Sequence, residues 1–334
     1  MSTQIPLYIV DSFTVGDGEV FTGGPSPIVL LKYDDEISDD QKQKLATSMK
    51  NSETAFVSLA WTKPEGEDLS SAVDSTKAIR RTLRWFTPAY EVPLCGYATA
   101  AAAKAVLKHY QLQQNTNDLV IESIEFETKF SGILGASFKK ENGKELITLS
   151  LDIFPTVPVD LTEDWIPELA SSVLGPAFPD IPAVVQDVQH APVFKHYLLL
   201  RLKKNPGESP AETLKKVKPD FERLVAAPSG DLESRLVMVT IEGDGDSGPD
   251  FYLRVFAPHY GVPEDPICGS AFCLLTPYWT GQLKKGDQEL KARHLAWRQG
   301  DLRCRIEGGR VLLTGVARVV VEGKLDLGFS VEPI

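Results

Sequence analysis

The chain contains one pattern twice, as LRWFTPAYEVP at residues 83–93 and as LRVFAPHYGVP at residues 253–263. Seven of the eleven paired positions are identical, and each copy leads into a Cys-Gly step, Cys95-Gly96 or Cys268-Gly269. The offset is 170 at the leucines (253 minus 83) and through the second proline, but 173 at the cysteines (268 minus 95), which places a three-residue insertion after that proline. A repeat half a chain apart predicts two related domains.

The length supports the same division. A chain of 334 residues suits two domains of about 150 residues each. We therefore expect an N-terminal domain at 1–150 and a C-terminal domain at 151–334, with the option that the C-terminal strand returns to the first domain.

Composition excludes several classes of function. With 43% hydrophobic and 24% charged residues the chain is typical of a soluble globular protein, and no apolar run reaches the roughly 20 residues of a membrane span. The first ten residues lack the pattern of a signal peptide, so a cytoplasmic location is expected. A net charge of -11 argues against a nucleic-acid partner.

No cofactor or metal is expected. The four cysteines form no Cys-x-x-Cys pair, the five histidines lack metal-ligand spacing, and no phosphate-binding glycine loop occurs. The turn at 243–250 resembles a calcium loop only loosely, because no glutamate closes it.

Local patterns predict the secondary structure. Ser38 and Gln41 form a capping-box signature for a helix that runs to about Lys50. The alanine-rich segment 98–107 has small side chains on nearly every face and predicts a central helix. Further helices are expected at 211–225 and from Ser270, with Pro277 kinking or ending the latter. Strands are expected at 7–13, 27–33, 54–61, 79–86, 119–126, 147–154, 183–188, 194–202 and 236–242. Short strands are expected over 290–329, with turns at Gly308-Gly309 and near Gly323. A surface loop is expected at 62–77, and the chain is expected to cross between the domains at 154–158.

The two Cys-Gly steps are candidates for chemistry. Each cysteine precedes a glycine that is expected to open a helix, where backbone N–H groups carry partial positive charge, lower the pKa of a thiol and bind anions. Two such helix starts facing each other would bind a small anionic carboxylate, with Cys95 on one side and Cys268 on the other. This arrangement suits proton transfer at a carbon next to a carboxylate.

Several motifs resemble those of the PhzF-like (phenazine biosynthesis protein) family. They are spread from residue 11 to about 279 in the expected order. The strings that carry the resemblance are DSFT at 11–14, SETAFV at 52–57, FTP at 86–88 running to VPLCG at 92–96, and EDPICGSA at 264–271.

The resemblance implies a diaminopimelate epimerase-like fold: two pseudo-symmetric α/β domains, each a curled mixed sheet around a central helix, with the active site in the cleft between them. It implies a cofactor-independent isomerase of biosynthetic type in which Glu53 moves a proton between carbons of a small, cyclic carboxylate. Asp265 matches an acid that contacts polar groups of the substrate. The substrate-binding positions would be Gly24, Gly96, Tyr97, Ala98, Gly269 and Ser270, and a homodimer is expected.

Two alternatives stay open. In the epimerase branch of this fold the two cysteines are acid and base, so Cys95 and Cys268 could form a two-thiol racemase. The chain also departs from the family pattern of Asn, His and His by having Gly24, Tyr97 and Phe272. These departures favour a different, more apolar acid as substrate, or a non-catalytic ligand-binding or interaction protein on the same fold.

Overall fold

A computed structural model describes residues 4–60, 78–114 and 121–327. The chain forms two compact units, one of residues 1–150 with 314–334, here called unit 1, and one of residues 151–313, here called unit 2. The expected loop at 62–77 lies outside the described residues.

Unit 1 is a closed ring of strands. Neighbouring strands pair in the order β1, β2, β3, β4, β6, β7, β8, β17 and back to β1, with parallel pairs β2–β3 and β4–β6 among the antiparallel ones. The strands are β1 Gln4–Ser12, β2 Gly24–Leu31, β3 Thr54–Ser58, β4 Ala78–Phe86, β5 Glu91–Val92, β6 Ser123–Thr128, β7 Ile133–Glu141, β8 Lys144–Leu151 and β17 Arg310–Asp326.

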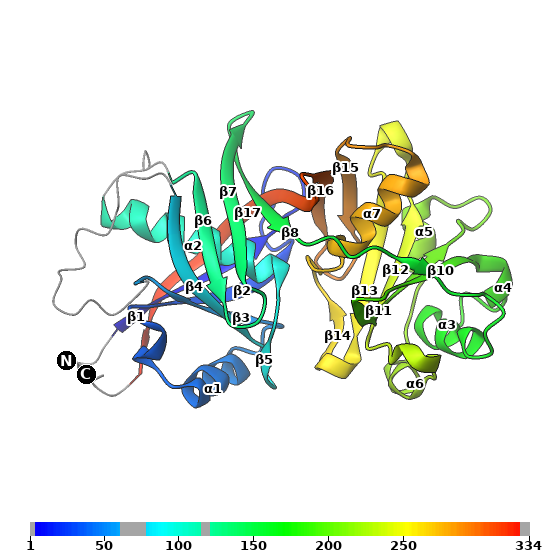
Figure 1. The fold of residues 1–334 in the computed structure, drawn as a ribbon, viewed down its shortest axis with the longest axis horizontal. Helices are drawn as coiled ribbons and strands as arrows, with labels where there is room; N and C mark the ends of the chain where they lie inside the picture. The colour runs from blue at the N-terminus through cyan, green and yellow to red at the C-terminus, as the bar shows by residue number, and fades with distance from the viewer. Residues whose placement is uncertain (1–3, 61–77, 115–120, 328–334) are drawn as a thin grey trace. The chain divides into compact units, whose positions relative to one another are not determined.

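Helix α2 (Gly96–Gln113) contacts β1, β2, β3 and β7 and lies among the strands of this ring (Figure 1). Its first ten residues apart from Lys104 are buried, because alanine side chains let the strands approach on every side. The prediction of a central helix is confirmed. Helix α1 (Asp39–Met49) covers the outer face, where a core cluster joins Val29, Phe56 and Phe86 to Ala46.

Unit 2 is a mixed sheet in the order β9, β10, β11, β12, β13, β15, β16, with β14 paired to β13. Its strands are β9 Val157–Pro158, β10 Val185–Ala191, β11 Phe194–Leu202, β12 Leu236–Glu242, β13 Phe251–Ala257, β14 Val262–Asp265, β15 Leu290–His294 and β16 Gly300–Glu307. Its helices are α3 Ile166–Leu174, α4 Ile181–Val184, α5 Pro210–Lys215, α6 Phe221–Ala226 and α7 Phe272–Leu283.

Two layers of helices cover the sheet of unit 2. On one face α3, α5 and α6 pack against β11 and β12 in a core that includes Leu174, Leu198 and Val239. On the other face α7 places Trp279 against Phe251, with ring centroids 5.5 Å apart. Burial on both faces explains why β11 and β12 are continuous apolar runs rather than alternating ones. The α/β class, with mixed sheets and a helix packed against each, is confirmed.

Local signals set the boundaries of several elements. The capping box of α1 is formed as predicted: the Ser38 side chain accepts from the N–H of Gln41, whose side chain accepts from the N–H of Ser38. Lys50 then ends α1 in the left-handed conformation.

Three predictions of secondary structure were wrong. The helix expected at 211–225 is two short helices, because Pro219 cannot continue α5 and Asp220 caps α6 instead. Gly323 does not turn the chain; it lies inside the long strand β17, paired with Leu7 of β1. The second helix starts at Phe272 rather than at Ser270.

Pro277 neither ends α7 nor leaves a carbonyl unsatisfied. It lacks the N–H that would bond to the carbonyl of Cys273 four residues earlier. The backbone N–H of Phe154 donates to that oxygen instead, at 2.9 Å. The segment that follows β8 is thereby attached to α7 within unit 2.

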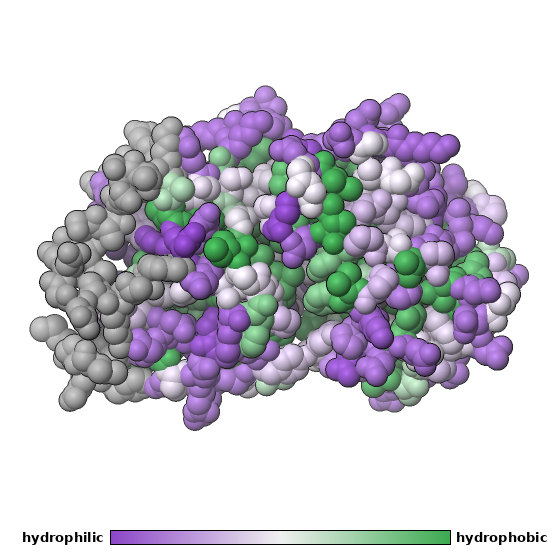
Figure 2. Space-filling view, viewed as in Figure 1, coloured by the Kyte–Doolittle hydropathy of each residue, from purple (hydrophilic) through white to green (hydrophobic). Residues whose placement is uncertain are grey.

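The visible surface carries polar and apolar side chains in separate areas (Figure 2). In the face drawn in Figure 2, hydrophilic side chains cover the upper and lower margins of the described residues. No helix in the described ranges is long and apolar enough to cross a bilayer.

Candidate active site

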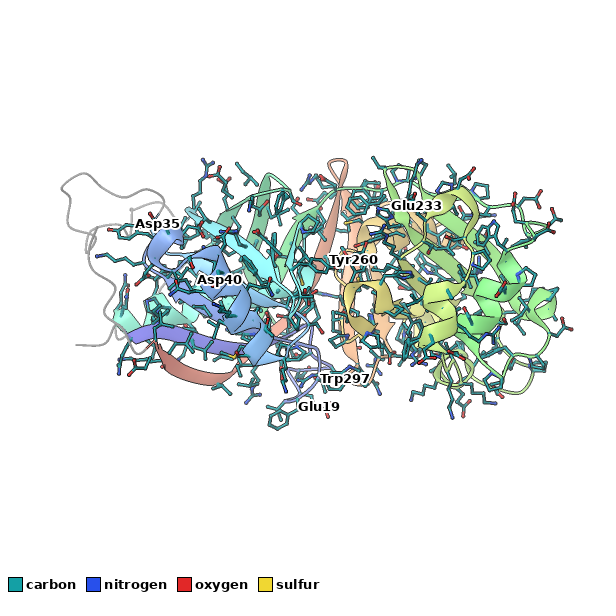
Figure 3. The ribbon with its side chains drawn as sticks, turned by 90° about the horizontal axis from the view of Figure 1, so that it is seen from below. Glu19, Asp35, Asp40, Glu233, Tyr260 and Trp297 are labelled. Carbon is teal, nitrogen blue, oxygen red and sulfur yellow. The ribbon has the colours of Figure 1, made fainter. Side chains whose placement is uncertain are left out.

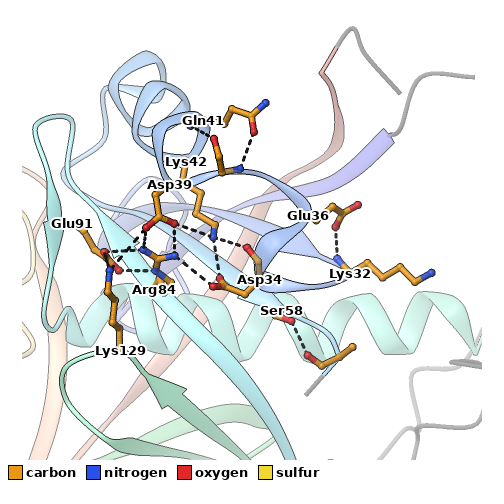
Figure 4. Close-up of polar contacts among 12 residues, drawn as sticks. Lys32, Asp34, Glu36, Asp39, Gln41, Lys42, Ser58, Arg84, Glu91 and Lys129 are labelled. Carbon is orange, nitrogen blue, oxygen red and sulfur yellow. Dashed lines mark hydrogen bonds and ion pairs between the residues drawn. The ribbon is translucent and has the colours of Figure 1, made fainter. Parts of the chain in front are cut away.

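A short hairpin precedes each of the two Cys-Gly steps, and an arginine side chain binds the two strands of each hairpin together. In unit 1 the Arg84 guanidinium on β4 binds Glu91 on β5 at 2.7 Å and Asp39 at the start of α1 at 2.6 Å (Figure 4). A hydrogen bond from Arg84 holds the pKa of Asp39 down, at about 2. Burial acts to raise the pKa of Glu91, but the bonds from Arg84 and Lys129 outweigh it and the net shift is downward. The network fixes β5 just before Cys95.

Unit 2 repeats this anchor. Arg254 on β13 binds Glu264 on β14 at 2.7 Å, and it donates to the carbonyl of Val217 at 2.6 Å. Glu91 pairs with Phe86, and Glu264 pairs with Phe256. The two glutamates are therefore equivalent.

The strand register places the three-residue insertion of the repeat earlier than the sequence comparison does. The offset is already 173 at the glutamates (264 minus 91), so the three extra residues lie in the turn before Glu264 and not after the second proline. Tyr260 belongs to this longer turn and is labelled in Figure 3. Asp265 consequently occupies the place of Val92, so the first copy has no acid there.

In unit 1 the structure brings three predicted residues together. Glu53 lies between α1 and β3, and it is partly exposed. Its backbone carbonyl accepts a hydrogen bond from the Ser26 hydroxyl on β2 at 2.9 Å, which fixes the turn against the sheet. The Tyr97 hydroxyl, from the first turn of α2, donates to Oε2 of Glu53.

The third residue of this group is Gly24, at the start of β2. A Cβ built on Gly24 would lie 2.6 Å from Cδ2 and 2.8 Å from Cγ of Tyr97. Both distances are shorter than carbon atoms tolerate. The ring of Tyr97 thus occupies the space in which a side chain at position 24 would begin.

The first Cys-Gly step has the predicted geometry. Cys95 is the N-cap of α2 in an extended conformation, and Gly96 is the first helical residue. Cys95, Gly96 and Ala98 are all buried. The carbonyl of Cys95 accepts from the N–H of Thr99 at 3.1 Å and from its hydroxyl at 2.6 Å.

In unit 2 the predicted residues form a second group around Asp265. Its Oδ1 accepts from the N–H of Ile267 at 3.0 Å. The residue is partly buried. This burial raises the pKa of Asp265 to about 6, although the Ile267 N–H and the Cys268 thiol oppose the shift. Such a carboxyl can exchange a proton near neutral pH.

A chain of short polar contacts continues from this acid. The sulfur of Cys268 lies 3.5 Å from Oγ of Ser270, and the Tyr197 hydroxyl on β11 lies 2.8 Å from the same Oγ. Tyr197 was not predicted, because a tyrosine inside an apolar strand carries no signal of a polar role. Gly269, which lies between Cys268 and Ser270 in the sequence, is buried.

The expected activation of Cys268 is wrong. Burial, and next the adjacent Asp265, raise the pKa of its thiol well above the ordinary value. Burial is the main cause. Cys268 also does not directly precede a helix, because residues 269–271 form successive tight turns and α7 begins only at Phe272. Phe272 itself is fully buried and lies beside Phe251.

No group of three metal-ligating side chains occurs within the described ranges.

Charged residues labelled in Figure 3, such as Asp35 and Asp40, are exposed on the surface of unit 1.

Comparison with known proteins identifies the family. The family model described as phenazine biosynthesis-like protein matches residues 10–323. The chain belongs to the phenazine biosynthesis-like protein family.

Two curated relatives match this chain over almost the whole length of both proteins. Phenazine biosynthesis-like domain-containing protein 2 of Mus musculus is 36% identical over 325 residues, covering 96% of this chain and 99% of its own. A protein of Pseudomonas aeruginosa named as an uncharacterized isomerase is 33% identical over 324 residues, covering 97% of this chain and 99% of its own.

Solved structures share the fold. A PhzF-family protein of Enterococcus faecalis has a TM-score of 0.71 at 28% identity and covers 97% of this chain and 100% of its own. A protein of Pseudomonas aeruginosa described as a predicted epimerase has a TM-score of 0.62 at 13% identity, covering 97% and 99%. The epimerase-like fold implied by the sequence motifs is confirmed.

Proposed function

We propose that this chain is a cofactor-independent isomerase in which Glu53 moves a proton between carbons of a small, cyclic carboxylate. Membership of the family, together with the isomerase name of a full-length relative, supports an isomerase-type activity. The observation that carries the assignment to Glu53 is its placement: a partly exposed carboxylate, fixed at the turn before β3 and bonded to Tyr97 from the first turn of α2.

The chemistry needs only a proton carrier. The Glu53 carboxylate takes a proton from one carbon of the substrate, and the carboxylic acid so formed returns it to another carbon, so nothing is oxidised or reduced. The backbone N–H groups at the start of α2, beginning at Gly96, are suited to the substrate carboxylate because the N-terminus of a long helix attracts anions.

We propose that Asp265 serves as a second acid or as a ligand for polar groups of the substrate. With its pKa raised to about 6, roughly a tenth of the Asp265 carboxyl groups are protonated at pH 7, and this form can donate a hydrogen bond or a proton. Gly269 and Ser270, which follow it, would hold polar groups as well.

The first experiment screens ligands and then tests Glu53. A panel of small cyclic carboxylic acids and amino acids is scanned for a rise in melting temperature, since a ligand at 100 times its Kd adds about 2.7 kcal/mol of stability. Each stabilising compound is then incubated with protein and followed by NMR for a new isomer. Glu53→Gln should keep the thermal shift and lose at least 100-fold in isomer formation. Full turnover by Glu53→Gln would refute the assignment.

A two-thiol racemase is the competing enzyme reaction. It requires a thiolate at Cys268, and the raised pKa of that thiol leaves little thiolate at neutral pH. Alkylation separates the two reactions: iodoacetamide at pH 7.5 should modify Cys268 far more slowly than it modifies free cysteine. Rapid alkylation of Cys268, together with inactive Cys268→Ser, would favour the two-thiol reaction.

The remaining alternative is a non-catalytic binding protein, which the departures from the family pattern at three polar positions favour. Two of these positions do not support it, because Phe272 is part of the core of unit 2 and Tyr97 keeps a hydroxyl that bonds to Glu53. Isomer formation with any stabilising compound would exclude this reading. Thermal stabilisation without turnover for every compound in the panel would favour it.

A further inference from the structure

We propose that Tyr97 is a positioning residue that holds the Glu53 carboxylate through its hydroxyl, and that it can do so only because position 24 is glycine. The catalytic meaning of this inference rests on the proposed function of Glu53. The three residues come from three separate elements of unit 1: the start of β2, the turn before β3 and the first turn of α2.

Position 24 has no room for a side chain. An added Cβ would meet two ring carbons of Tyr97 at 2.6 and 2.8 Å and a third, Cε2, at 3.2 Å. Tyr97 is 1% exposed and lies on a helix enclosed by strands, so the ring cannot move aside without disturbing the packing of α2. Any side chain at position 24 therefore displaces the ring, and with it the hydroxyl that reaches Glu53.

The single proton of the Tyr97 hydroxyl is already used in a hydrogen bond. A phenol has one O–H to donate, and here it is directed at Oε2 of Glu53. The same proton cannot also bind a substrate carboxylate. Tyr97 is thus better assigned to Glu53 than to the substrate, which changes the role that the sequence motif gives it.

The hydrogen bond is donated by the Tyr97 hydroxyl and accepted by the Glu53 carboxylate, which affects the chemistry of Glu53. A donated hydrogen bond stabilises the charged form of a carboxyl group, so it favours Glu53 as a base before the substrate arrives. It also fixes the rotamer of the glutamate, whose backbone is already held through Ser26. Orientation of this kind contributes to catalysis because the carboxylate need not be ordered during reaction.

The first test is a double-mutant cycle on stability. Gly24→Ala should lower the melting temperature by about 5 °C, because overpacking a core site strains it. In the background of Tyr97→Ala, where the ring is absent, Gly24→Ala should cost almost nothing. Gly135→Ala is the matched control on β7, since its Cβ would lie 3.9 Å from the Cβ of Ser150 and clash with nothing. Equal losses for Gly24→Ala in both backgrounds would contradict a clash between position 24 and the ring.

The second test reads Glu53 directly, without substrate. The side-chain carboxyl carbons of glutamate are labelled with carbon-13, and the Glu53 signal is assigned by its absence in Glu53→Gln. Tyr97→Phe keeps the ring and removes the hydroxyl, so the Glu53 carboxyl should titrate at a higher pH than in the unmodified protein. Gly24→Ala should shift it in the same direction, and adding Tyr97→Phe to Gly24→Ala should shift it no further.

The outcomes separate this inference from the proposed function. An unchanged titration of Glu53 in both Tyr97→Phe and Gly24→Ala overturns the positioning role, whatever the activity. Turnover by Glu53→Gln would refute Glu53 as the proton carrier but leave the titration and the stability cycle as evidence for the contact. If Tyr97→Phe fails to fold, the Gly24→Ala titration alone decides.

Discussion

Asp265 ends β14 in a partly buried position, and its pKa reflects that burial. Its pKa is raised to about 6, above the ordinary value of 3.8, mainly because burial disfavours the charged form. Between about pH 4 and pH 6 the folded protein therefore binds more protons at this site than the unfolded chain. By linkage, the contribution of Asp265 to stability falls as pH rises through this window.

Replacing this acid by a neutral isostere gives a prediction with a definite sign. Asp265→Asn keeps an oxygen that can accept from Ile267 and removes the buried charge. Relative to the unmodified protein, the free energy of unfolding of the variant should rise by about 2 kcal/mol between pH 4 and pH 7. Urea titrations at both pH values measure it, with Asp246→Asn, at an exposed turn, as control. A difference that stays constant with pH would contradict the buried-charge account.

The sequence predicted individual residues unevenly. The motif around Glu53 and the acid at 265 could be recognised because each stands in a run of identifiable neighbours. The contact between Gly24 and Tyr97 could not, because it joins residues 73 positions apart through the shape of one ring. The pKa of Cys268 was predicted in the wrong direction, since a Cys-Gly step shows neither the turns before α7 nor the depth of burial.

At the scale of elements, the hairpins that precede the two Cys-Gly steps depend on arginines. The Arg84 side chain is 9% exposed, and its partner Glu91 is 14% exposed. Removing one member of such a pair leaves the other charge partly buried without compensation, which is costlier than losing a surface pair.

Arg84→Met tests this anchor by removing the guanidinium, whose central carbon lies 5.2 Å from the centroid of the Phe86 ring, while keeping an unbranched side chain. We expect a loss of about 3 kcal/mol in the free energy of unfolding. Arg80→Met is the matched control on the same strand, because Arg80 and Glu125 are each 47% exposed and such pairs contribute under about 1 kcal/mol. Chemical denaturation measures both. Equal effects of the two substitutions would show that the anchor adds nothing beyond a surface ion pair.

Elements with local signals were predicted best. The capping box at Ser38 and the alanine-rich segment of α2 are determined by residues close in sequence, and both were found as expected. Pro219 is a local signal against the single helix predicted at 211–225. Gly323 misled because a glycine often marks a turn, whereas pairing with Leu7, more than 300 residues away, holds it in a strand.

At the scale of the whole molecule, the end of the chain completes the unit formed by its beginning. β17 pairs with β1 along the full length of β1, from Gln4 with Asp326 to Ser12 with Ala317. It also pairs with β8, and the hydroxyls of Thr148 and Thr314 lie 2.8 Å apart. The length of the chain predicted two domains, but only long-range pairing reveals which one the last strand joins.

Truncation after Leu313 should therefore affect the two units differently. Unit 1 would lose the strand that closes its ring and leave β1 and β8 with unpaired edges. Hydrogen exchange followed by mass spectrometry should show loss of protection in β1, while α7 and β12 of unit 2 keep theirs. Full protection of β1 in the truncated chain would contradict the closed-ring account.

Solvent isotope exchange measures whether Glu53 carries the proton. Unmodified protein, Glu53→Gln and Cys268→Ser are incubated in deuterium oxide with a compound that raises the melting temperature. If Glu53 carries the proton, one C–H signal of the ligand should disappear with unmodified protein and with Cys268→Ser. Exchange should be at least 100-fold slower with Glu53→Gln, although the ligand still stabilises that variant. Exchange at the unmodified rate in Glu53→Gln would contradict this role of Glu53.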